Sequence, residues 1–212
     1  MDRIALASAS PRRLDILLRL GFATQPFPAD IDESVYAALP AARQVKKLAQ
    51  DKAEKALPLA PPEYRWILAA DTLIELPAPP SQSTNGSEPA LVLGKAADRA
   101  SAAAMLQQLA GREHLVHTGL ALLDRQKGRT ALIVNTSSVR FAKLTAAEMD
   151  WYLNSAEWRG VAGAYRIQGM GGLFISAIHG SYSGIMGLPI HEFYVILGEL
   201  GFDLSGLKPT AF

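Results

Sequence analysis

The sequence predicts a protein of the α/β or α+β class. Short apolar runs that suit strands, such as residues 65–71, alternate with segments that repeat apolar residues at helical spacing, such as residues 40–57. Of the 212 residues, 49% are hydrophobic, which suffices for a sizeable core in one globular domain or in two closely packed lobes. We therefore expect a single domain over residues 1–212.

Sequence signals mark where the elements begin and end. The first helix follows a strand at residues 4–7; Ser10 suits its N-cap, Leu14, Leu17 and Leu18 form its apolar face, and Gly21 suits its C-terminal end. The other expected strands are at residues 23–28, 65–71 with an extension to 76, 91–95, 114–124 and 130–141, and the other expected helices are at 40–57, 98–109, 145–153 and from Pro189 onward.

Two segments break the periodic pattern. Residues 77–90 are rich in Pro, Ser, Asn and Gly, so we expect a flexible loop inserted into a hairpin. Residues 163–189 are dense in glycine, which indicates that the backbone there comes close to a neighbouring group.

Composition excludes several classes of protein. With 21 basic and 20 acidic side chains the net charge is +1, which provides no electrostatic footprint for long nucleic acid. The absence of cysteine excludes disulfides, thiolate metal sites and cysteine nucleophiles. No apolar run approaches the ~20 residues of a membrane span, and the apolar start is too short for a signal peptide, so we expect a cytoplasmic protein. Neither a P-loop nor an HExxH motif is present.

The start of the first helix carries an unusual set of polar residues, Ser8, Ser10, Arg12 and Arg13. Cations in a first helical turn oppose the helix dipole by ~0.3–1 kcal/mol. Hydroxyls, guanidiniums and backbone N–H groups at a helix N-terminus all suit a phosphate. We therefore predict an anion site here, with solvated arginines on a surface turn as the alternative.

Lys52 lies in the middle of the apolar face of the helix at 40–57, among Val45, Leu48, Ala49 and Ala56. Its stem either runs along this face to reach water or directs the ammonium inward. An inward ammonium requires an anion to offset its desolvation. We predict an anionic ligand for Lys52.

Acidic residues form a second candidate group. Asp71 follows an apolar strand, and ligand sites of α/β sheets lie beyond the carboxyl ends of strands, although an Asp at such a place also commonly starts a turn. Asp30, Asp32 and Glu33 lie on a predicted loop. Paired with Asp71 across a cleft, these carboxylates suit Mg²⁺ or Mn²⁺. Lys95, near a strand end, is a weaker candidate.

Taken together, these motifs resemble the Maf family of nucleotide pyrophosphatases. The matching segments, in order along nearly the whole chain, are residues 8–13, 32–33, 52–53, 70–72, 94–95, 117–119, 163–169 and 180–189. Each motif is weak alone, but eight in order are specific. Ala96, Arg166 and Gly184 depart from the usual family pattern.

The resemblance implies a mixed twisted sheet flanked by helices, in two closely packed lobes around a central cleft, an ITPase-like fold. It also implies hydrolysis of a nucleoside triphosphate between the α and β phosphates, aided by Mg²⁺ or Mn²⁺. Asp71 would be the proton acceptor, and Glu33 would be a second catalytic residue. Both carboxylates would hold the metal. The implied phosphate ligands are Ser8, Ser10, Arg13, Lys52 and Lys95.

Within the family, the chain resembles the branch that acts on dTTP and UTP, in which Arg12, Thr72 and Gln168 are tied to base recognition. The Gln168 amide can pair with N3–H and a carbonyl of uracil or thymine, but a rotated amide could pair with cytosine, so neighbours must fix its orientation. Such an enzyme would keep non-standard nucleotides, including modified pyrimidines, out of nucleic acids.

The alternatives are the 7-methyl-GTP branch of the family and a non-catalytic nucleotide-binding regulator of cell division. We expect a nucleoside triphosphate as the partner and neither nucleic acid nor a membrane. The family resemblance suggests a homodimer.

Overall fold

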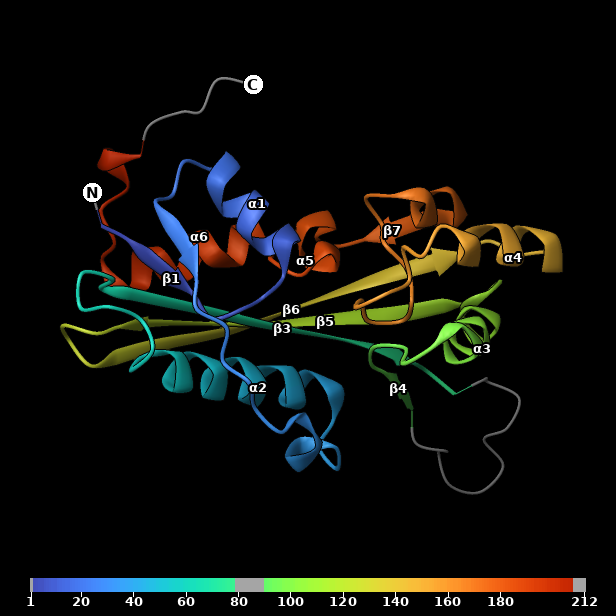
Figure 1. Cartoon of the computed structure of the whole chain (residues 1–212), viewed down its shortest axis with the longest axis horizontal. Helices are drawn as coiled ribbons and strands as arrows, with labels where there is room; N and C mark the ends of the chain where they lie inside the picture. The colour runs from blue at the N-terminus through green and yellow to red at the C-terminus, as the bar shows by residue number, and fades with distance from the viewer. Residues whose placement is uncertain (1, 79–89, 208–212) are drawn as a thin grey trace. The chain divides into compact units, whose positions relative to one another are not determined.

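The computed structural model describes residues 2–78 and 90–207 (Figure 1). Its elements are β1 (Ile4–Leu6), α1 (Pro11–Arg19), β2 (Thr24–Pro26), η1 (Glu33–Tyr36), α2 (Ala41–Ala56), β3 (Trp66–Leu76), β4 (Leu91–Leu93), α3 (Arg99–Leu109), β5 (Glu113–Asp124), β6 (Arg129–Phe141), α4 (Ala146–Asn154), η3 (Met170–Phe174), β7 (Ile175–His179), α5 (Tyr182–Met186), α6 (Ile190–Leu200) and η4 (Leu204–Gly206). The loop expected at 77–90 lies outside the described residues, apart from positions 77, 78 and 90.

Seven strands pair into one mixed sheet, which confirms the predicted fold class. The strand order is β2-β1-β3-β5-β6-β7, and β4 pairs with β3 beside this path. β1 runs parallel to β2 and β3, so that Ile4 lies opposite both Thr24 and Trp66. The β3–β4 and β6–β7 pairs are antiparallel.

The chain divides into two compact units. The first comprises Met1–Asp71, Thr118–Asn135 and Gly187–Phe212, and the second comprises Thr72–His117 and Thr136–Met186. Strands β3, β5 and β6 each contribute residues to both units. Asp71 and Thr72, adjacent in β3, therefore belong to different units.

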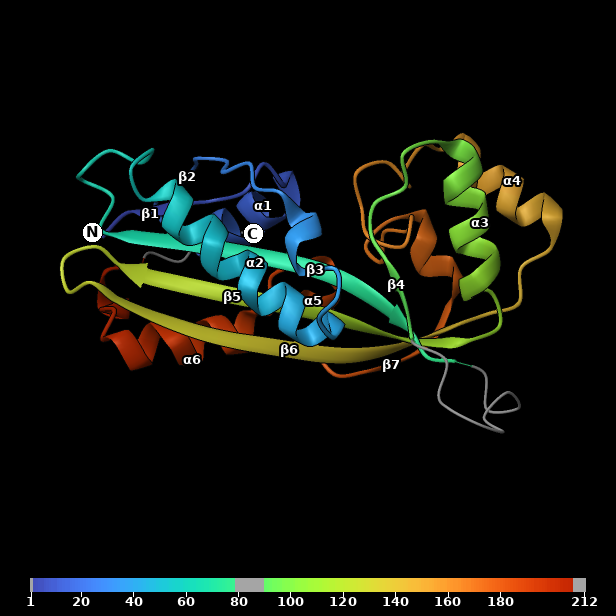
Figure 2. The ribbon, with the colours of Figure 1, turned by 90° about the horizontal axis from the view of Figure 1, so that it is seen from below.

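In the first unit, α2 covers one face of the sheet, and α1 and α6 cover the other (Figure 1). Figure 2 shows α2 lying over β3. Part of the contact surface is made of small side chains, because Ala49, Ala53 and Ala56 of α2 share a buried cluster with alanines of the strands. α2 can therefore approach the sheet closely.

Gly119 on β5 marks the point of closest approach. A Cβ atom added there would lie 2.3 Å from the backbone oxygen of Val45 on α2. Any side chain at Gly119 would push α2 away from the sheet. This contact explains why glycine follows His117 and Thr118 in the sequence.

The first helix begins and ends as predicted, but it buries a different face. Gly21, just beyond its end, has a φ of +82°, the left-handed conformation that favours glycine. Leu17 is fully buried, whereas Leu18, expected in the core, is 47% exposed. Ile16 is buried instead, because the helix packs through its Ile16–Leu17 edge. The expected apolar face was wrong at this position.

The second unit has a core of its own, which includes Leu106, Phe141, Tyr152, Trp158 and Phe174. Its helices α3 and α4 lie side by side (Figure 2). Helix α4, expected at residues 145–153, begins with a capping box, in which the Thr145 and Glu148 side chains each accept the other's backbone N–H.

The C-terminal part of the chain was predicted unevenly. Helix α6 begins after Pro189, as predicted, and buries Phe193, Ile196, Leu197 and Leu200. The glycine-dense segment before it contains β7 and α5, which the sequence did not indicate because neither has a clear apolar repeat. Within residues 2–78 and 90–207, none of the helices has the length and apolar character that crossing a membrane requires.

Candidate active site

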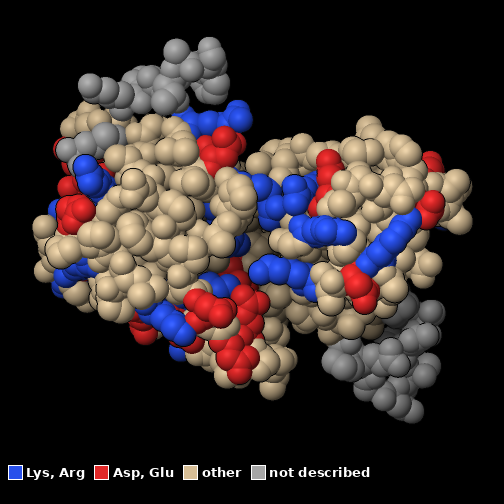
Figure 3. Space-filling model, viewed as in Figure 1, with Lys and Arg blue, Asp and Glu red and all other residues tan. Residues whose placement is uncertain are grey.

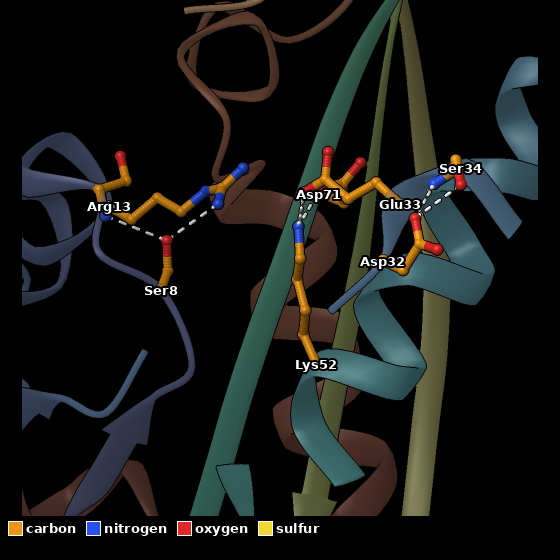
Figure 4. A network of polar contacts seen from close by, with 8 residues as sticks. Ser8, Arg13, Asp32, Glu33, Ser34, Lys52 and Asp71 are labelled. Atoms are coloured by element: carbon orange, nitrogen blue, oxygen red, sulfur yellow. Dashed lines mark hydrogen bonds and ion pairs between the residues drawn. The ribbon is translucent and has the colours of Figure 1, made fainter. Parts of the chain in front are cut away.

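Lys52 joins two carboxylates in the first unit (Figure 4). Its Nζ lies 2.6 Å from Oδ1 of Asp71 and 2.7 Å from Oε1 of Glu33. The Lys52 side chain is 12% exposed, so the ammonium points inward as predicted and does not run out to water. Within the protein, the anions that offset its desolvation are these two carboxylates.

Three different elements deliver these side chains. Lys52 projects from the middle of α2, and Glu33 is the first residue of η1. Asp71 is 8% exposed and lies inside β3, which continues to Leu76. The alternative in which Asp71 starts a turn is therefore wrong.

The three acids near the predicted loop have different roles. Asp32 caps η1, because its Oδ1 accepts hydrogen bonds from the backbone N and the hydroxyl of Ser34 at 3.0 and 2.6 Å. The hydroxyl bond, followed by the backbone bond, lowers the pKa of Asp32. The backbone carbonyl of Asp30 accepts a hydrogen bond from the Lys55 ammonium. Of the three carboxylates, Glu33 is the one bonded to Lys52.

Arg13 extends from the first turn of α1 toward Asp71 (Figure 4). Its Nε donates to the carbonyl of Gly187 at 2.8 Å, and its guanidinium donates to the hydroxyl of Ser8 at 3.0 Å. Burial lowers the pKa of Arg13, and the negative charges of Asp71 and Glu33 oppose this shift. Arg13 is thus electrostatically coupled to both carboxylates.

Charges of opposite sign balance in this part of the first unit. Arg13 and Lys52 carry two positive charges, and Glu33 and Asp71 carry two negative charges. The group is close to neutral, as is the whole chain, and the face drawn in Figure 3 carries side chains of both signs. A nucleoside triphosphate, with several negative charges, would need further positive charge at such a group.

The remaining polar residues of α1 take different positions. Ser10 is the N-cap, as predicted, but its side chain makes no capping hydrogen bond. The hydroxyl of Ser8 accepts from the backbone N of Ser10 at 3.1 Å as well as from Arg13. Arg12 is half-buried in the first turn. The phosphate role of the serines and the base-recognition role of Arg12 stay predictions.

Three predicted site residues belong to the second unit. Thr72 is half-buried in β3, directly after Asp71. Lys95 is exposed, and its backbone forms an isolated bridge with Ala162. Gln168 is exposed on the turn that precedes η3. Their roles in phosphate binding and base recognition stay predictions.

Two histidines of the second unit make polar pairs. His114 lies in the core, where its Nε2 is 2.9 Å from the Tyr165 hydroxyl, and burial lowers its pKa to about 4. His117 pairs with Thr136 at 2.9 Å and lies 3.4 Å from Glu75. Burial lowers the pKa of His117, and Glu75 opposes the shift. The sequence did not indicate a role for Glu75, because its partner His117 lies 42 positions later in the chain.

The carboxylates of the first unit suit a divalent cation. Among the described residues, Oδ2 of Asp71 is buried with no hydrogen-bond partner, so it is a free oxygen ligand. No group of three or more His, Asp or Glu side chains suited to a metal occurs within residues 2–78 and 90–207. Mg²⁺ commonly binds through one or two carboxylates and completes its shell with water and substrate phosphate. Glu33 and Asp71 fit that pattern.

Comparison with known proteins agrees with the motifs. A family model described as "Maf-like protein" matches residues 3–200. A dTTP/UTP pyrophosphatase of Neisseria gonorrhoeae is 38% identical over 99% of this chain and 100% of its own length. A dTTP/UTP pyrophosphatase of Myxococcus xanthus is 41% identical, over 95% of this chain and 94% of its own length.

The fold also has a relative among solved structures. A HAM1 protein from Coxiella burnetii superposes with a TM-score of 0.50 at 18% identity, over 94% of this chain and 100% of that chain. This similarity concerns the fold alone and agrees with the ITPase-like architecture expected above. The family match covers nearly the whole chain, and full-length relatives share more than a third of its residues: the chain belongs to the Maf family.

Proposed function

We propose that the protein is a nucleoside triphosphate pyrophosphatase that hydrolyses dTTP and UTP. The products are the nucleoside monophosphate and pyrophosphate. Relatives at 36–41% identity bear the name dTTP/UTP pyrophosphatase, which supports the proposal. Removal of unwanted or modified pyrimidine nucleotides is the biological role this activity would serve, in the cytoplasm where these nucleotides are used.

The observation that carries the proposal is the contact of Lys52 with both Asp71 and Glu33. A protein that only binds a nucleotide needs positive charges to hold the phosphates. It has no need for two carboxylates, which neutralise those positive charges. An enzyme that activates water needs a base beside the cations. The paired carboxylates therefore favour catalysis over binding alone.

Asp71 is the proton acceptor in this proposal. Its Oδ1 is bonded to Lys52, while its Oδ2 has no partner among the described residues and can take the proton of the attacking water. As the water oxygen bonds to phosphorus, the α–β anhydride bond breaks and pyrophosphate leaves. The ammonium of Lys52 holds the carboxylate in place, and Glu33 holds the ammonium from a second side.

The remaining side chains neutralise and orient the phosphates. Arg13 and Lys52, with Lys95 of the second unit, supply positive charge, and Ser8 and Ser10 supply hydroxyl donors. Phosphoryl transfer depends mainly on positioning and charge neutralisation, which these groups provide. A bound Mg²⁺ or Mn²⁺ would be held by Glu33 and Asp71 and would supply the further positive charge that the near-neutral group lacks.

Base choice falls to Gln168, Arg12 and Thr72. The Gln168 amide has a donor and an acceptor that match the N3–H and carbonyl of uracil and thymine. Because thymidine and uridine substrates differ at the ribose, both sugars are accepted. We expect poorer cleavage of CTP and of purine triphosphates.

A nucleotide panel tests the proposal. Purified protein is incubated with Mg²⁺ or Mn²⁺ and each of dTTP, UTP, CTP, GTP and 7-methyl-GTP, and pyrophosphate is measured. Many equivalents of pyrophosphate per protein are expected from dTTP and UTP. Release of one equivalent or less would leave the regulator alternative, and a higher kcat/KM for 7-methyl-GTP would assign the chain to another branch.

A further inference from the structure

Two side chains hold the ends of the short segment that carries Gln168. The backbone N–H of Met170 donates to Oε2 of Glu157 at 2.9 Å. The backbone N–H of Arg166 donates to the Tyr152 hydroxyl at 3.3 Å. Gln168 lies midway between these two anchored positions, and all five residues belong to the second unit.

Gly169 shows how closely the segment packs against Glu157. Its φ of −121° is one that any residue adopts, so backbone conformation does not require glycine here. A Cβ atom at this position, however, would lie 2.4 and 2.6 Å from the two carboxylate oxygens of Glu157. The carboxylate of Glu157 therefore lies directly against the backbone of Gly169, the residue that follows Gln168.

The bonds that hold this segment are stable in neutral solution. Burial raises the pKa of Tyr152 to about 12, so its hydroxyl stays neutral. Glu157 accepts a charge-assisted hydrogen bond, which is stronger than a neutral one. Arg166 is the cation near Gln168 that departs from the family pattern. Its guanidinium donates a hydrogen bond to the carbonyl of Arg159 at 3.2 Å. This bond ties the Arg166 side chain to the turn after α4.

We propose that Glu157 and Tyr152 are positioning residues that set the base selectivity of Gln168. The inference rests on the proposed function, in which Gln168 recognises the base. A glutamine amide free to reorient can pair with a uracil or a cytosine edge. By fixing the backbone on both sides of Gln168, Glu157 and Tyr152 restrict the positions from which its side chain can reach the base, and so limit the poses in which the amide can pair with cytosine.

The test compares Glu157→Ala with two matched variants. Glu157→Gln keeps an oxygen that can accept the Met170 N–H. Glu148→Ala removes another glutamate that accepts a backbone N–H, at 2.8 Å from Thr145, but at the other end of α4. For each variant, kcat/KM is measured with UTP and CTP, and the folded fraction is measured by thermal denaturation.

Glu157→Ala should lower the ratio of kcat/KM for UTP over CTP about three- to tenfold, the range that the loss of one hydrogen bond corresponds to. The change should appear mainly as a higher KM for UTP. Glu157→Gln and Glu148→Ala should keep the wild-type ratio. A merely structural role of Glu157 would lower stability without changing this ratio.

An unchanged ratio in folded Glu157→Ala would overturn the inference and leave the proposed function in place. If Glu157→Ala does not fold, Tyr152→Phe tests the other end of the segment, and an unchanged ratio there overturns the inference equally. A wild-type protein that turns over none of the nucleotides would overturn the proposed function together with the inference.

Discussion

Replacement of Lys52 by methionine should destabilise the protein by removing the ion-pair partner that lies 2.6 Å from the buried Asp71 carboxylate. Methionine keeps the length and apolar character of the lysine stem, so packing on α2 is preserved. Removal of one partner from a buried ion pair typically costs about 3–5 kcal/mol. Because Lys52 retains 12% exposure and Glu33 is 45% exposed, we expect the lower end, about 3 kcal/mol, with Glu33 adding little.

In a protein of this length, such a loss corresponds to a fall in Tm of about 6–12 °C. The free energy of unfolding is measured by urea denaturation at pH 7 for Lys52→Met, Asp71→Asn and the double variant. The double variant should recover much of the loss, because it removes the charge of Asp71 as well. Lys47→Met, on the exposed side of α2, is the control and should change stability by less than about 0.5 kcal/mol.

Two results would refute this reasoning. The first is a Lys52→Met protein as stable as the wild type, which would mean that the ion pair with Asp71 does not form. The second is a double variant whose loss of unfolding free energy equals the sum of the losses in Lys52→Met and Asp71→Asn, because residues in direct contact must show an interaction energy. Pyrophosphate release by the same variants gives a separate readout, in which Lys52→Met should lose activity.

Three further predictions concern the proton acceptor, the contact between α2 and the sheet, and a buried histidine. Asp71→Asn should retain the fold but lose about 10²–10⁴ in kcat, the usual cost of a missing general base, and near-normal turnover would show that the base lies elsewhere. Gly119→Ala should lower the free energy of unfolding by about 1–3 kcal/mol, because its Cβ would lie 2.3 Å from the Val45 carbonyl oxygen; an unchanged urea midpoint would contradict this contact. His114 is held neutral by burial, with a pKa of about 4 against 6.5 when unfolded, so the unfolded state binds more protons in between. The neutral His114 therefore costs the folded state nothing above pH 6.5, and its effect should lower the free energy of unfolding by about 3 kcal/mol as the pH drops to 4. Urea denaturation between pH 4 and 7 should show this part of the pH dependence in the wild type and not in His114→Phe.

The sequence predicted side-chain direction better than it predicted partners. Helical spacing placed Lys52 on the apolar face of its helix and left two directions open for the ammonium, and the structure shows the inward one. The contact between Lys52 and Asp71, 19 positions apart, depends on how α2 lies on the sheet, which local spacing does not specify. Likewise, the glycines after Gln168 indicated a close backbone approach, but nothing in the sequence identified Glu157 as the neighbour of Gly169.

Predictions failed where the local pattern was ambiguous or lacking. In α1, Ile16 and Leu18 are both apolar, and tertiary packing alone decides which of them is buried. β7 and α5 are 5 residues each, too short for a periodic signal. β7 is a strand because it pairs with β6, and that pairing depends on residues more than 30 positions earlier.

The packing at Gly119 divides the candidate active site into a rigid part and an adaptable part. At Gly119 the backbone of α2 touches the backbone of the sheet, and three of the inner residues of α2 are alanines, so few side chains there can give way. A shift of Lys52 would therefore require the two layers to separate. Glu33 lies instead on η1, where none of the four residues is buried. A change of substrate range, by natural divergence or by directed evolution, should therefore accumulate in the segment around Glu33, while α2 accepts few substitutions on its inner face.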